Sequence, residues 1–146
     1  MAMGVIFLAF GYGKITGDFV RGGFAKAAGD AAREAWPFWR PVLEGVVVPN
    51  AEAFGWIFAV AELAVGIGLL LGFLTRIAAA GGMALMLAIL LHQTYVPGES
   101  WHGWVTAGLN AKLAFLAFAL LFLTDSGRVW GLDGRIRKSP RVSRRV

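Results

Sequence analysis

Residues 54–76, FGWIFAVAELAVGIGLLLGFLTR, constrain the fold of this chain more than any other segment. The run is apolar and long enough to cross a bilayer, because about 20 helical residues at ~1.5 Å rise each cover a hydrocarbon core of ~30 Å. Its interior nevertheless carries a carboxylate, Glu62. A charged side chain inside a membrane span is rare, usually faces other helices, and usually has a partner. The group that Glu62 faces is therefore the main question about this sequence.

The composition indicates an integral membrane protein. Of the 146 residues, 58% are hydrophobic and 16% are charged, and the mean hydropathy is +0.65. A chain of this size cannot hide so much apolar surface inside a water-soluble core. The chain contains no cysteine, which excludes disulfides, thiol redox chemistry and cysteine-ligated metal centres within it. We expect no metal site.

The positive charge of the chain has an explanation other than nucleic acid. The formal net charge is +5, and seven of the 14 basic residues follow Asp125. A basic tail behind a membrane span sets the orientation of the protein and contacts lipid headgroups. We therefore expect the lipid bilayer, and no nucleic acid, as the partner of these charges.

Four apolar runs predict an all-α fold, an integral membrane four-helix bundle that forms a single domain over residues 1–146. The expected spans are residues 2–15, 54–74, 77–93 and 105–123. The first run is short for a core of ~30 Å, so it would tilt or thin the bilayer. A secretory signal is the alternative for this run, but it lacks a basic n-region and a clear cleavage site.

The connections between the spans differ in character. Residues 16–50 mix charges with aromatic side chains, and we expect short amphipathic helices there, at the membrane surface, capping the bundle. Asn50 is the expected N-cap of the second span. The link between the second and third spans is tight, which predicts an antiparallel hairpin. Residues 94–104 carry no lysine or arginine and are expected to form an interfacial loop.

The distribution of basic residues predicts the orientation. The tail over residues 125–146 has seven basic residues and the loop over residues 94–104 has none. The positive-inside rule then places both termini in the cytoplasm, in a multi-pass protein of the cytoplasmic membrane. Residues 16–50 depart mildly from the rule, with four basic residues on the outer side.

Polar side chains inside the spans fall at similar depths. Counting ~1.5 Å per residue from the span boundaries places five of them in the outer half of the bilayer: Lys14, Glu62, His92, Asn110 and Lys112. Two lysines and one glutamate leave about one positive charge in excess, and excess charge in a low-dielectric layer favours binding of an anion. We therefore predict a site in this layer, entered from outside.

Each of these residues also has a purely structural interpretation. Lys14 could extend to the outer interface. Glu62 and Lys112 could form an interhelical ion pair that only fixes the packing. His92 could be interfacial, and Asn110 could hydrogen-bond between helices.

Two weaker patterns concern helix packing. AELAV at residues 61–65 and AKLAF at residues 111–115 align at an offset of 50. If this is an internal repeat, Glu62 and Lys112 occupy equivalent positions and face each other across the bundle. Small residues four apart, among them Gly13 and Gly17, predict close approach between helices.

Three short motifs stand out in the sequence: GYGKI in the first span, GRVWGLD near the C-terminus, and the pattern E-x-x-x-G-x-x-L-x-x-G-x-x-T-R, formed by Glu62, Gly66, Leu69, Gly72, Thr75 and Arg76. Together they resemble the DoxX family, which includes DoxD, the small subunit of thiosulfate:quinone oxidoreductase. The resemblance implies a four-helix protein of the bacterial or archaeal cytoplasmic membrane, linked to quinone-dependent oxidation and working with a partner subunit. It carries over Lys14, Glu62 and Arg76 as functional positions.

These observations lead to a preferred hypothesis and two others. The chain would be a subunit of a quinone-linked oxidoreductase, with Glu62 and His92 in proton transfer and with Lys14, Lys112, Asn110 and Arg76 binding the quinone or an anion. Quinone would be its substrate or bound cofactor, and a second subunit or a second copy its protein partner. The alternative is a non-catalytic subunit that anchors a larger redox or photosynthetic complex. A small-solute carrier is least favoured, because four short spans leave little room for alternating access.

Overall fold

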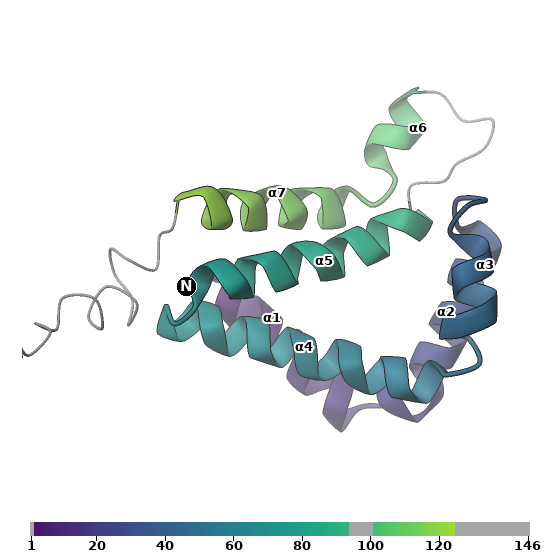
Figure 1. The fold of residues 1–146 in the computed structure, drawn as a ribbon, viewed down its shortest axis with the longest axis horizontal. Helices are drawn as coiled ribbons and strands as arrows, with labels where there is room; N and C mark the ends of the chain where they lie inside the picture. The colour runs from purple at the N-terminus through teal and green to yellow at the C-terminus, as the bar shows by residue number, and fades with distance from the viewer. Residues whose placement is uncertain (1, 94–100, 125–146) are drawn as a thin grey trace, which may run out of the picture.

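The computed structural model describes residues 2–93 and 101–124, apart from the side chains of His92 and Trp104. Every regular element within these residues is helical, which confirms the all-α prediction for this part of the chain. Figure 1 shows the arrangement of the helices. The elements are α1 Ala2–Thr16, the π-helical turn η1 Phe19–Gly23, α2 Phe24–Glu34, α3 Arg40–Val42, the π-helical turn η2 Leu43–Val47, α4 Ala51–Leu71, α5 Thr75–Gln93, α6 Trp101–Thr106 and α7 Leu109–Thr124.

The long helices α1, α4, α5 and α7 pack side by side, each antiparallel to the next in the row. The turn between α4 and α5, the start of α1 and the end of α7 lie together, and we name this the turn end (Figure 1). The opposite end is covered by α2, α3 and η2, and we name it the capped end. The predicted antiparallel hairpin of the second and third spans is confirmed as α4 and α5.

Helices α1 and α4 approach closely because glycines remove side chains from their interface. A Cβ atom on Gly4 would lie 2.9 Å from Leu70 Cγ, and one on Gly66 would lie 2.7 Å from the backbone nitrogen of Leu8. A small-residue interface of this kind lets helices associate through backbone-level packing. The prediction that Gly13 serves such a contact was wrong, since a Cβ on Gly13 would meet no atom within 4 Å.

Phe118 joins three of the long helices at the centre of the bundle. Its side chain is fully buried, and its ring meets the ring of Phe7 on α1 edge-on, with centroids 4.8 Å apart and an interplanar angle of 87°. Gly82 on α5 provides the space, because a Cβ there would lie 2.4 Å from the Phe118 ring. The edge-on geometry places the positive rim of one ring on the face of the other.

The boundaries of α4 differ from the predicted span over residues 54–74. The helix begins at Ala51 and ends at Leu71, because Gly72 adopts the left-handed conformation at φ 58° and closes the helix. Leu74 also has a positive φ of 50° in this turn. Asn50 precedes the helix but does not cap it, since its side-chain nitrogen donates to Val46 O at 2.9 Å instead.

The predicted fourth span, residues 105–123, is not one helix. The chain forms the short helix α6, breaks at Ala107 and Gly108, and starts α7 at Leu109. Gly108 has a φ of 64°, which allows the sharp change of direction between the two helices. The predicted loop over residues 94–104 is helical from Trp101 onward, and residues 94–100 lie outside the described part of the chain.

Helix α2 is amphipathic, as predicted for the segment between the first two spans. It buries Phe24, Ala28, Ala31 and Ala32, and its charged side chains, including Lys26 and Arg33, are exposed. The backbone N–H of Trp36 donates to Leu91 O at 3.3 Å, which ties the end of this segment to α5. The short helices therefore cover one end of the bundle.

By length and composition, α4 is the helix among the described residues that could cross a membrane alone. Helix α1 and the segment η1–α2 pass the same test only as one broken span, and they are bent by 66°. Helices α5 and α7 are also apolar, but their apolar stretches, Thr75–Leu91 and Leu109–Thr124, are shorter than that of α4. The prediction of four independent spans is therefore only partly supported.

Candidate functional site

An ion pair between Lys14 and Glu62 lies at the centre of the candidate site. Lys14 is near the end of α1 and Glu62 is in the middle of α4, and the antiparallel register of the two helices brings them together. The Lys14 Nζ atom donates a hydrogen bond to Glu62 Oε1. The Glu62 side chain is 4% exposed and the Lys14 side chain 25%. The carboxylate is therefore buried, while the ammonium keeps some access to the surface.

Lys14 has a second partner. Its Nζ atom lies 4.9 Å from the centre of the Phe19 ring, within the range of a cation–π interaction. Phe19 belongs to η1, directly after the bend that follows α1. The bend thus holds the ammonium between a carboxylate and an aromatic ring.

The other oxygen of Glu62 is unsatisfied. Its Oε2 atom is buried and has no hydrogen-bond partner among the described residues. Leaving a buried polar group without a partner costs about 1 to 3 kcal/mol. A hydrogen-bond donor on a bound ligand would offset this cost.

A groove of about 800 Å³ runs beside the ion pair between α1 and α7, and we name it the α1–α7 groove. Its volume is within the range typical of small-molecule sites. Its lining is mostly apolar, with polar groups near the capped end. It is lined by Met3, Ile6, Phe7, Phe10, Lys14, Glu62, Met86, Ile89, Gln93, Thr106, Gly108, Leu109, Asn110, Ala111, Leu113, Ala114 and Ala117.

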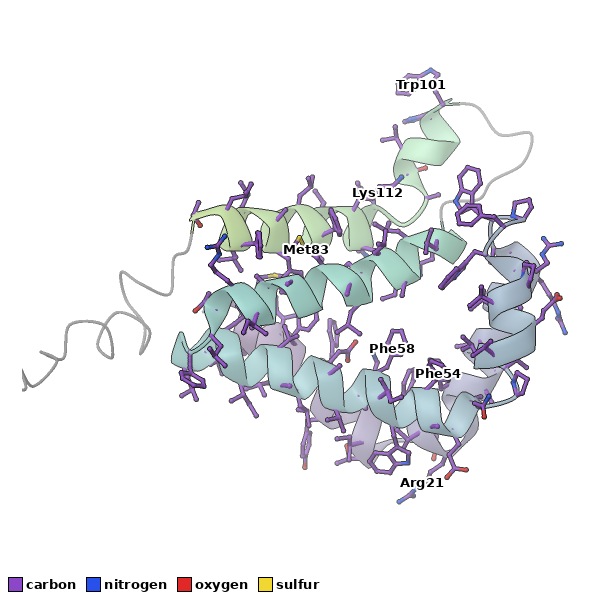
Figure 2. The ribbon with its side chains drawn as sticks, viewed as in Figure 1. Arg21, Phe54, Phe58, Met83, Trp101 and Lys112 are labelled. Carbon is purple, nitrogen blue, oxygen red and sulfur yellow. The ribbon has the colours of Figure 1, made fainter. Side chains whose placement is uncertain are left out.

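A second space of about 480 Å³ lies between the bundle and the helices that cover it, and we name it the capped cavity. Figure 2 shows Phe54 and Phe58 pointing from α4 into the region between α4, α5 and the capped end. The rest of its lining comes from Lys14 at the end of α1, from the segment over residues 19–47 and from α5. It is lined by Lys14, Phe19, Phe24, Ala27, Ala28, Ala31, Trp39, Val42, Leu43, Val46, Val47, Phe54, Phe58, Ala88, Ile89 and Gln93.

The two spaces share part of their walls. Lys14, Ile89 and Gln93 line both the α1–α7 groove and the capped cavity. The ion pair therefore stands at the boundary between an aromatic cavity and an apolar groove.

Lys112 does not join this arrangement. Asn110 lines the α1–α7 groove, but Lys112 lines neither of the two spaces. Its Nζ atom donates to Val105 O at 3.4 Å, and Figure 2 shows it beside α6. Within the described residues, the groove is thus lined by one lysine and one glutamate, without the predicted excess of positive charge. The carboxylate pairs with Lys14 rather than facing Lys112 across a repeat.

Arg76 lies at the turn end, remote from the ion pair. Its guanidinium carbon is 4.8 Å from the centre of the Phe122 ring, where it makes a cation–π contact between α5 and α7. The side chain of His92 lies outside the described residues. No group of three or more potential metal ligands occurs among the residues that the structure describes.

The aromatic lining of the capped cavity was not predicted from the sequence. Phe54, Phe58 and Glu62 recur at every fourth position of α4, so they lie on one helix face. That spacing could have linked these rings to the carboxylate. Phe24 packs on Phe58 with ring centroids 5.5 Å apart, and this contact depends on the fold of the capped end.

The comparisons with known proteins support the resemblance found in the motifs. Residues 1–93 match the DoxX family model, a segment that contains α1 to α5 and both members of the ion pair. Asn110 and Lys112 lie beyond the matched segment. No curated protein matches this chain, and no solved structure does.

Proposed function

Because the chain belongs to the DoxX family of membrane proteins, we propose that it is a membrane subunit of a quinone-linked oxidoreductase. The observation that supports this most directly is the Lys14–Glu62 pair at the boundary of two spaces of small-molecule size. The carboxylate could exchange a proton and the ammonium could donate a hydrogen bond, which are the functions that a quinone site requires.

In this proposal α1, α4, α5 and α7 cross the bilayer together as a four-helix bundle. Each of them exposes large apolar side chains that water would not favour, such as Phe10, Val60, Ile77 and Leu120. Helix α7 has 16 residues, which at ~1.5 Å each is shorter than a core of ~30 Å, so the bilayer thins locally or the flanking residues extend to the interface.

The capped end faces outward and both termini lie in the cytoplasm of a bacterium or archaeon. The arrangement of the helices places the start of α1 and the end of α7 at the same end of the bundle. Seven basic residues follow Asp125, and the positive-inside rule retains such a segment on the cytoplasmic side.

The charge of the pair favours an uncharged ligand over an anion. Lys14 and Glu62 neutralise each other, so a quinone or quinol can enter without burying a net charge. Lys14, which lines both spaces, donates to a quinone carbonyl oxygen, and Asn110 adds a polar group to the lining of the groove. Glu62 Oε2 accepts a hydrogen bond from the hydroxyl of a quinol or holds the proton for transfer. Converting the quinone to quinol takes two electrons and two protons, and the electrons come from a reductant such as an inorganic sulfur anion, oxidised at a partner subunit.

A non-catalytic anchoring subunit is the second candidate. Phe38 and Trp101 are 66% and 78% exposed near the capped end, and large exposed aromatic side chains are enriched where proteins associate. In this alternative the ion pair only fixes the register of α1 and α4.

Quinone content distinguishes the two candidates. The protein is extracted in mild detergent, and bound quinone is measured for the parent, for Lys14→Met and for Glu62→Gln. We expect quinone in the parent and its loss in both variants. Lys26→Met on the exposed face of α2 is the matched control and should retain it. A parent without quinone that co-purifies with a large partner would favour the anchoring subunit.

A further inference from the structure

We infer that the two spaces divide one ligand between them: the capped cavity takes a flat ring and the α1–α7 groove takes the long apolar tail attached to it. This inference rests on the proposed function and specifies how the site recognises its substrate. The ligand class is a ring with carbonyl groups on opposite sides and a hydrocarbon tail.

The walls of the capped cavity suit a ring. Phe24 lies between two other rings, with centroid distances of 5.5 Å to Phe19 and 5.5 Å to Phe58. Phe54 adds another ring to the lining. Aromatic faces and edges stack on a planar ring at centroid distances of about 4.5 to 7 Å. A flexible chain would use only the apolar area of these walls, whereas a ring also uses their geometry.

Hydrogen-bond donors flank the capped cavity on different elements. Lys14 lines it from the end of α1. Trp39, which precedes α3, also lines it, and its indole N–H is buried without a hydrogen-bond partner among the described residues. A ring carbonyl provides the acceptor that a buried donor requires. A hydrocarbon tail in the same place would leave this donor unsatisfied.

The α1–α7 groove suits a tail. Ile6 and Phe10 line it on α1, and Leu113 lines it on α7, and all are exposed at the surface of the bundle. The groove continues along α7 to Ala117, two turns beyond Leu109. A tail lying there would contact protein on one side and lipid chains on the other. The shared wall of Lys14, Ile89 and Gln93 gives the point where the ring joins the tail.

Matched substitutions of alanine test this assignment. Ala88 on α5 lines the capped cavity and Ala117 on α7 lines the groove, and both are partly buried. Ala88→Phe fills the ring position and Ala117→Phe fills the tail position. The probes are a substituted benzoquinone without a tail and the same benzoquinone with a decyl tail, titrated against the purified protein.

Ala88→Phe should weaken both probes by about tenfold or more, since overfilling a packed space carries a substantial cost. Ala117→Phe should weaken the decyl probe by a similar factor and leave the tail-less probe unchanged. Trp39→Phe keeps the apolar bulk, removes the N–H, and should weaken both probes by about fivefold. Ala28→Phe, on α2 in the lining of the capped cavity, replaces Ala88→Phe if the Ala88→Phe variant has a melting temperature well below that of the parent.

The reverse pattern, in which Ala88→Phe affects only the decyl probe and Ala117→Phe affects both, would overturn the assignment by placing the tail under the cap. Unchanged binding of both probes to Ala88→Phe and Ala28→Phe would also overturn it. A parent that binds neither probe would contradict the proposed function itself, and so the two failures are distinguishable.

Discussion

Lys14 on α1 donates a hydrogen bond to Glu62 on α4, and this contact joins two residues that are 48 positions apart in the chain. It neutralises the buried carboxylate within α4 and fixes the register of two helices that glycines allow to approach closely. Because Lys14 lines both the α1–α7 groove and the capped cavity, and Glu62 lines the groove, changes to the pair should affect stability and ligand binding in separable ways.

Glu62→Gln should lower the stability of the protein. The amide keeps the size of the side chain but removes the negative charge that Lys14 requires. A fully buried pair would lose about 3 to 5 kcal/mol, but Lys14 is partly exposed and can move toward the interface, so we expect a loss of about 1 to 3 kcal/mol. The melting temperature in detergent, compared between the parent and Glu62→Gln, measures this loss of stability. Glu52→Gln, on the exposed first turn of α4, is the control, and equal melting of parent and Glu62→Gln would contradict the ion pair.

Replacing both members of the pair should cost less than replacing one. The double variant Lys14→Met, Glu62→Leu leaves no unpaired charge and fills the same space with apolar atoms, an exchange that is often neutral for buried pairs. We expect its melting temperature to lie closer to the parent than that of Glu62→Gln, while its quinone content is lost. If the double variant lost as much stability as Lys14→Met and Glu62→Leu lose in sum, the two side chains would not be coupled.

Gly66→Ala should separate α1 from α4. The added Cβ would lie 2.7 Å from the Leu8 nitrogen and 3.0 Å from the Gly4 oxygen, and backbone atoms cannot move aside without shifting a helix. We expect a loss of about 1 to 3 kcal/mol in the free energy of unfolding. Gly13→Ala has open space around it and should be neutral or slightly stabilising, since alanine favours a helix. Equal melting temperatures of Gly66→Ala and Gly13→Ala would contradict the close packing of α1 on α4 at Gly66.

Lys112→Met should retain bound quinone. Its ammonium contacts Val105 O and it lines neither space, whereas Lys14 lines both. The measurement is quinone content in the same detergent as for Lys14→Met, which should lose it. Loss of quinone from Lys112→Met with an unchanged melting temperature would return this lysine to the site and restore the excess positive charge expected from the sequence.

The proposed orientation can be tested with single cysteines, because the natural chain has none. Gly45 in η2 is exposed at the capped end and has space for a side chain. Phe73 is exposed at the turn end. An impermeant maleimide added to intact cells should label a cysteine at residue 45 and not one at residue 73. Labelling in the opposite sense would place the capped end and both spaces on the cytoplasmic side.

The helical character of the chain was predictable because it depends on local properties. Apolar runs broken by polar segments predicted α1, α4 and α5 with errors of a few residues. The amphipathic pattern predicted α2. The end of α4 was misplaced because Gly72, like many glycines in this chain, can take either sign of φ, and nothing in the neighbouring residues indicates which it adopts. The break before α7 was missed at Gly108 for the same reason.

The presence of a buried carboxylate that needs a partner followed from residues 54–76 alone, since a charge in an apolar span must be compensated. Which lysine compensates it did not follow. Lys14 and Lys112 lie at similar estimated depths, and depth is all that a rise per residue supplies. The choice depends on which helices touch and how each is rotated about its axis, and these are set by the packing of Gly4, Gly66 and Phe118 between segments distant in the chain. The same packing placed Phe24 against Phe58 and so formed the capped cavity, because a cavity exists only between elements that the fold brings together.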